Sequence, residues 1–162
     1  MLGNSFASRL LLSFVFLALF GLSLGAATRI TAFEKSTLII DTVAGPRRFA
    51  IELAVSPREQ EQGLMFRRKL APDAGMLFDF GAVRPAAFWM HDTPLSLDML
   101  FIAANGRIAD IHEGATPMSD AIIVSKVPVR AGLELAGGTV GRLGIRVGDV
   151  VHYQIFGTAP RD

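Results

Sequence analysis

The sequence predicts a mainly β, α+β fold: a small single-domain β-structure, barrel-like or a sandwich, with one or two short helices. Short apolar runs recur along the chain between residues that favour turns. The run RRFAIELAV, at 47–55, alternates apolar side chains with others, as a half-buried strand does. Asn105-Gly106 lies between two apolar runs, which is the strongest short-range signal for a two-residue hairpin turn.

Residues 1–27 have the pattern of a secretory signal peptide. Arg9 precedes an apolar run at 10–24, and small residues follow at 25–27. The run is shorter than the roughly 20 apolar residues that a membrane-spanning helix needs, so an uncleaved anchor is the weaker alternative. We therefore expect an exported protein, periplasmic or secreted, with no membrane anchor after cleavage.

The remainder of the chain suits one domain. Cleavage after Ala27 leaves 135 of the 162 residues, enough to bury a core. We expect a lead-in and first strand at 28–47 and a β domain at 48–157.

The elements are expected in the following order. Ser56 and Pro57 have the pattern of a helix N-cap and first turn, and Gly63 ends that helix. Gly144 closes a second helix of one turn. The strands are expected at 36–43, 47–55, 75–81, 86–90, within 98–113, at 121–127, at 131–135 and at 150–156.

Composition excludes several classes of function. Without Arg9 the chain carries 15 basic and 15 acidic side chains, so no global field attracts nucleic acid or acidic lipid. The absence of cysteine excludes disulfides, thiolate catalysis and an N-terminal lipid-modified cysteine. No nucleotide-binding or serine-nucleophile motif is present, and we expect no cofactor and no resident metal.

Carboxylates give one candidate chemistry. A two-residue turn at Asn105-Gly106 would place Asp98 opposite Glu113, and paired carboxyl groups can serve as general acid and base. Asp98 with Glu113 or with Glu134 is therefore the hydrolase hypothesis. The alternative is structural, with Asp98 accepting backbone hydrogen bonds and Glu113 in water.

Thioether and imidazole groups give a second candidate chemistry, metal binding. The same register places Met99 opposite His112, with Met90 in the preceding segment, and this soft ligand set would suit copper in an oxidising compartment. Methionine is also a common filler of cores, so packing is the competing interpretation.

Trp89, the only tryptophan, could stack against a ligand or line the core. Glu134, between two leucines, would either face solvent at a sheet edge or pair with Arg67 in the interior.

Five motifs resemble the bacterial and archaeal family called domain of unknown function 192. They are GLMFRRKL (63–70), GMLFDF (75–80), FWMHDTPLSLDMLFI (88–102), LELAGG (133–138) and GIRVGDVV (144–151), and the resemblance runs from about Phe49 to Phe156. It implies a compact, mainly β domain, often exported, with no established activity. Family members tend to carry Lys-Asn where this chain has His91-Asp92.

A common site of that family would be sought among the positions that match its motifs: Arg67, Trp89, Met90, Thr93, Asp98 and Glu134. The function therefore expected is binding of an unidentified small ligand or protein partner in a groove near Trp89 and Asp98, with the hydrolase and copper hypotheses as alternatives.

Overall fold

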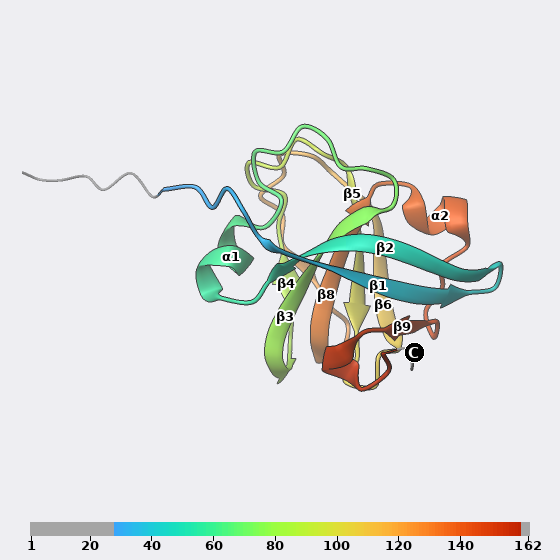
Figure 1. The fold of residues 1–162 in the computed structure, drawn as a ribbon. Helices are drawn as coiled ribbons and strands as arrows, with labels where there is room; N and C mark the ends of the chain where they lie inside the picture. Colours follow the sequence, from blue (N-terminus) through green and yellow to red (C-terminus); the bar gives the residue numbers. More distant parts are fainter. Residues whose placement is uncertain (1–27, 160–162) are drawn as a thin grey trace, which may run out of the picture.

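The computed structural model describes residues 28–159, and the expected signal peptide at 1–27 lies outside them. Seven strands form one curled sheet, a half-barrel, in the order β6-β5-β8-β3-β2-β1-β9, and two short strands, β4 and β7, form a separate pair (Figure 1). The predicted mainly β fold is confirmed. The bounds are β1 Glu34–Thr42, β2 Gly45–Ala54, α1 Pro57–Gln62, β3 Ala74–Arg84, β4 Ala87–Phe88, β5 Leu97–Ile102, β6 Ile108–Ala115, β7 Ile123–Val124, β8 Val129–Ala136, α2 Thr139–Leu143, β9 Val150–His152 and the 3₁₀ helix η1 Gln154–Phe156.

Helix α1 begins and ends where the sequence predicts. The Ser56 hydroxyl accepts the N–H of Glu59, and the Glu59 carboxylate accepts the N–H of Ser56, which makes a capping box. Gly63 ends the helix with a positive φ of 46°. The helix lies between β2 and β3, which pair in parallel.

The sheet has a separate hydrophobic core on each face. The inner core, enclosed by the curl, contains Leu38, Ile40, Phe49, Ile51, Leu77, Leu100, Ile102, Leu133, Leu135, Val140, Val151 and Phe156, among others. The outer core, which extends to the β4 segment, contains Phe33, Leu64, Met76, Phe78, Phe88, Met90, Leu97, Met99, Phe101 and Val129, among others. Residues that alternate along one strand therefore enter different cores.

The turn between β5 and β6 is one residue longer than predicted. The Ala103 N–H donates to the Arg107 carbonyl and the Gly106 N–H to the Ala103 carbonyl, so Ala104 and Asn105 are central and Gly106 follows with a φ of 79°. This is a three-residue loop with a bulge, not a type I′ turn. The bulge changes the partner of Ile102 from Ala109 to Ile108. Beyond it, the predicted pairing of Met99 with His112 is present.

The two edge strands of the sheet meet at one end. The Val151 N–H donates to the Gly106 carbonyl at 2.7 Å, and the Ile108 N–H donates to the Asp149 carbonyl at 2.9 Å. Strand β9 ends at His152, earlier than the predicted Phe156, because the chain turns into η1 and places Phe156 in the inner core. Among the described residues no helix is long and apolar enough to cross a membrane.

Replacement of Gly106 tests this edge contact. A Cβ at Gly106 would lie 2.7 Å from the Val151 carbonyl oxygen, whereas Gly81, with a similar φ of 74°, has nothing within 4 Å. Both Gly106→Ala and Gly81→Ala carry the left-handed backbone penalty, roughly 1–2 kcal/mol. We expect Gly106→Ala to cost at least about 1 kcal/mol more in urea unfolding, because only there must backbone move. Equal losses would contradict the edge contact.

Candidate functional site

A row of side chains crosses the outer face of the sheet, one from each of five adjacent strands. Glu52 on β2 pairs with Met76 on β3, Met76 with Glu134 on β8, Glu134 with Met99 on β5, and Met99 with His112 on β6. Met76 and Met99 are fully buried, so thioethers flank Glu134 on both sides. Neither neighbour offers it a hydrogen-bond donor or a positive charge.

Arg67 does not reach Glu134. Its guanidinium pairs with Glu52 and lies 5.6 Å from the centre of the Phe33 ring. Glu52 and Glu134 stand two strand spacings apart, about 10 Å, with Met76 between them. Both alternatives considered for Glu134 are therefore wrong: it does not pair with Arg67, and β8 is an interior strand between β5 and β3. Arg67 lines a neighbouring hollow with Lys35 and Leu70.

Glu134 is buried without a partner. Only 4% of the residue is exposed, and within residues 28–159 its carboxyl group makes no hydrogen bond or ion pair. Burial in this apolar setting raises the pKa of Glu134 to about 8, because the charged form loses its hydration. At neutral pH the carboxyl group is thus mostly protonated in the free protein.

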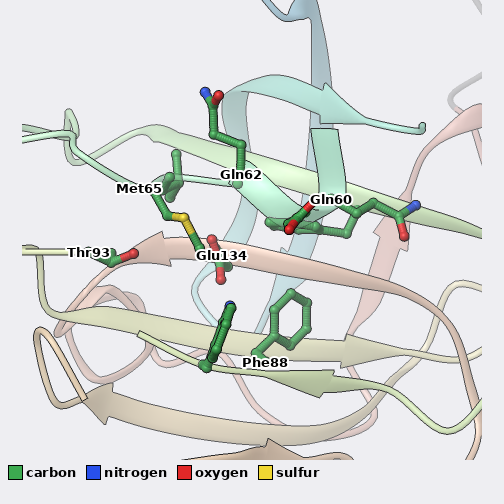
Figure 2. A pocket seen from close by; sticks show the side chains of 11 residues that line it. Gln60, Gln62, Met65, Phe88, Thr93 and Glu134 are labelled. Atoms are coloured by element: carbon green, nitrogen blue, oxygen red, sulfur yellow. The ribbon is translucent and has the colours of Figure 1, made fainter. Parts of the chain in front are cut away.

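The Glu134 side chain lines a narrow pocket. Figure 2 shows it pointing toward the Met65 thioether and the Phe88 ring, with Thr93 beside it and Gln60 and Gln62 above. The hollow has a volume of about 250 Å³, which includes open solvent, and it has room for about one water molecule. Its lining residues are Gln60, Glu61, Gln62, Gly63, Leu64, Met65, Phe78, Phe88, Trp89, Thr93 and Glu134.

Trp89 forms the exposed edge of this pocket. The residue is 42% exposed, and its ring stacks on that of His91 with centroids 4.8 Å apart. The hydrogen bond between His91 Nδ1 and Asp120, at 2.7 Å, raises the pKa of His91 and fixes the imidazole beneath the indole. The side chain at Trp89 is thus held in position while one part of it faces solvent.

Three of the six predicted site residues meet at this pocket: Trp89, Thr93 and Glu134. Met90 is 1% exposed within the outer core, where it packs instead of lining the hollow. Gln60, Met65 and Phe88 were not predicted, although Met65 and Phe88 lie in motifs shared with the resembled family. Their contribution depends on the loop after α1 and the β4 segment lying over β8, which no local pattern reveals.

Asp98 belongs to the opposite face of the sheet. It pairs with Leu135 on β8, whereas Glu134 pairs with Met99, so the two carboxyl groups project to different faces. The Asp98 carboxylate accepts the N–H groups of Gly114 at 2.9 Å, Gly138 at 3.2 Å and Val140 at 2.8 Å. Its structural interpretation is therefore confirmed: it holds the β6 bulge and the start of α2.

The positions of these carboxyl groups also contradict the hydrolase hypothesis. Asp98 and Glu134 cannot act on one bond from opposite faces. Glu113 is exposed within the bulge of β6, whereas Asp98 is buried and its oxygens accept three backbone N–H groups. The copper hypothesis is not supported either, because Met90 and Met99 are buried in the outer core while His112 is exposed to solvent. In the described part of the chain, no group of three or more His, Asp or Glu side chains gathers to hold a metal ion.

Replacing Asp98 by Asn tests its structural role. One carboxylate oxygen becomes an NH₂ group that faces backbone donors, so we expect a loss of about 1–3 kcal/mol in the free energy of unfolding. The matched control is Asp73→Asn at an exposed position, which should change stability by less than about 0.5 kcal/mol. Equal urea midpoints for the two variants would contradict this role.

Replacing Glu134 by Gln tests its burial. The pKa of Glu134 in the folded protein, about 8, lies above the usual glutamate value of 4.5, so wild-type stability should fall as the pH rises between these values. The fall is at most about 1.4 kcal/mol per pH unit. The difference between Glu134→Gln and wild type in urea unfolding should grow in the variant's favour from pH 5 to pH 8. Glu61→Gln at the exposed rim is the control, and parallel curves for Glu134→Gln would refute the prediction.

Comparison with known proteins agrees with the resemblance seen in the sequence. The model of the domain of unknown function 192 family, described as "Uncharacterized ACR", matches residues 39–153, and no curated protein matches. A crystal structure from Sinorhizobium meliloti 1021, of a protein described provisionally as a transcription regulator, is 49% identical with a TM-score of 0.75 and covers 78% of this chain and 99% of its own. One of a protein of unknown function from Novosphingobium aromaticivorans DSM 12444 is 33% identical with a TM-score of 0.74, covering 79% and 91%. The chain belongs to the domain of unknown function 192 family.

Proposed function

We propose that this protein is an exported binding module whose ligand or partner enters the pocket between Trp89 and Glu134. The observation that carries the proposal is a buried carboxyl group without a partner at the base of an open pocket. Burying such a group costs free energy, and a protein that serves only as a scaffold gains nothing from it. Unsatisfied buried polar groups with perturbed pKa values cluster at functional sites.

The pocket edge supports the same proposal. An exposed indole held over a second ring gives a large, rigid contact surface, which is a common anchor in binding sites. A wider hollow of about 840 Å³, partly open to solvent, shares Glu61, Gln62, Met65 and Trp89 with the pocket. A ligand could therefore place one end in the pocket and the remainder along the surface.

Nuclear magnetic resonance with a fragment set tests the binding proposal. The set should contain amines, carboxylic acids, neutral alcohols and aromatic compounds, added separately to ¹⁵N-labelled protein. We expect at least one class to shift the Trp89 indole N–H together with the amides of residues 60–65, which line the same pocket. Trp89→Leu removes the indole signal and should weaken the shifts of those amides, and Val147→Leu, at an exposed site outside the pocket lining, should not weaken them.

If no chemical class perturbs these signals, the binding proposal fails. Export is checked on the same protein by a native mass spectrum of material recovered from outside the cytoplasm. We expect the mass of a chain that begins at Thr28, following the signal-peptide pattern of 1–27. Recovery of the full-length chain from the cytoplasm alone would contradict export.

A further inference from the structure

The chemistry of the pocket wall identifies what kind of group it accepts. Four neutral side chains in the lining can donate a hydrogen bond, and all but Trp89 already donate to the protein's own carbonyls. The Gln60 amide donates to Asp79 at 2.7 Å, the Gln62 amide to Ile30 at 2.8 Å, and the Thr93 hydroxyl to His91 at 3.0 Å. An anion would find these donors occupied and would meet the Glu134 carboxyl group as well. A ligand that brings donors and positive charge is complementary to this wall.

The surroundings of Glu134 lack a cation from the protein. Arg67 is bound to Glu52, Arg58 to the Thr28 carbonyl and Arg130 to Asp79. Arg84 donates to the Gln60 side-chain oxygen at 3.4 Å and lies over the Phe80 ring, and Arg29, at the wider hollow, lies over the Phe66 ring. No cation within residues 28–159 therefore pairs with the Glu134 carboxyl group, and a ligand could supply one.

The size of the pocket further restricts which ligand group can bind beside Glu134. The pocket has room for about one water molecule, and an ammonium group is similar in size, whereas a guanidinium or a sugar ring is larger. Around it lie the rings of Phe78, Phe88 and Trp89 and the Met65 side chain. Aromatic faces attract a cation, and aliphatic and thioether groups pack well against methylenes.

From this geometry we infer that the pocket binds a primary ammonium group at the end of an alkyl stem, with Glu134 as its counter-ion and Trp89 against the stem. The inference deepens the proposed function and rests on it. Two sources carry this chemistry: a free alkyl amine or diamine, and the side chain of a lysine in a peptide. The wider hollow that continues from Trp89 would accommodate the rest of either one.

Binding of this kind moves a proton. The ammonium group, with a pKa near 10.4, stays charged at neutral pH, whereas the free protein holds Glu134 mostly protonated. Formation of the ion pair therefore releases one proton from Glu134, and affinity should rise from pH 6 to pH 8. Among the pocket-lining residues the other titratable group is Glu61, at the exposed rim, and His91 lies behind Trp89. The hydrogen bond to Asp120 raises the pKa of His91, and loss of the His91 positive charge as the pH rises would act in the same direction.

The experiment compares probes of equal length. n-Butylamine, n-butanol and butyrate are titrated into the purified protein at pH 6, 7 and 8, and binding is followed at the Trp89 indole N–H. We expect n-butylamine to bind at least about tenfold more tightly than either other probe at pH 8, as an ion pair that replaces a lone buried carboxyl predicts. Its affinity should increase with pH, after correction for the effect measured in His91→Asn.

Variants and longer probes complete the test. Glu134→Gln should reduce the affinity for n-butylamine at least about tenfold and remove most of the pH dependence, while Glu34→Gln, at an exposed position outside the pocket and the wider hollow, should change the affinity by less than about threefold. The ¹⁵N spectrum of each variant shows whether the fold is intact. 1,5-Diaminopentane and a peptide containing one lysine then distinguish the two sources, with the same peptide acetylated at that lysine as the control.

Two results would overturn the inference. If n-butanol or butyrate binds at the Trp89 signal as tightly as n-butylamine, the pocket is a binding site but not for an ammonium group, and the proposed function survives. If n-butylamine binds folded Glu134→Gln as tightly as wild type, Glu134 is not the counter-ion. If no compound class in the fragment set shifts the pocket signals, the outcome is different, because the proposed function itself is refuted.

Discussion

The structure depends on strand β8, which lies between β5 and β3 and must satisfy both faces of the sheet at once. Leu133 and Leu135 enter the inner core, and Gly132 and Glu134 face outward. Gly132 leaves the space in which the Phe88 ring packs, since a Cβ there would lie 2.5 Å from that ring. The strand is thus restricted on one face by aliphatic packing and on the other by a close aromatic contact. A shift of one residue would bury the wrong set on both faces.

The same alternation explains why two buried carboxyl groups differ so much. Asp98 and Glu134 lie on adjacent strands, but one residue of register sends them to opposite faces. Asp98 meets the bulge of β6 and the first turn of α2, which supply three N–H donors. Glu134 meets only thioethers beside it and a pocket above it. One carboxyl group holds the fold together, and the other remains available for an external partner.

Much of the fold was predictable because its signals are local. The capping box of α1, the alternation of β2 and the turn at Gly106 each depend on residues close in sequence. The turn was placed one residue wrongly because Asn-Gly is compatible with both a two-residue loop and a bulged three-residue loop. The contact between Gly106 and Val151 decides between them, and it joins residues far apart in the chain. The last strand was predicted too long because burial of Phe156 by a turn looks, in sequence, like burial by a strand.

The sequence by itself determined the mainly β architecture with one or two short helices, since apolar period, caps and turn residues act over a few neighbours, and the family resemblance supplied the positions where a site was sought. Only the tertiary structure decided which of those positions act together. Trp89, Thr93 and Glu134 share a pocket because the β4 segment lies over β8, and Asp98 is excluded because register turns it to the inner face. Arg67 pairs with Glu52 rather than with Glu134 because strand β3, which carries Met76, separates Glu52 from Glu134. Such choices depend on which strands become neighbours, a long-range property that no stretch of sequence contains.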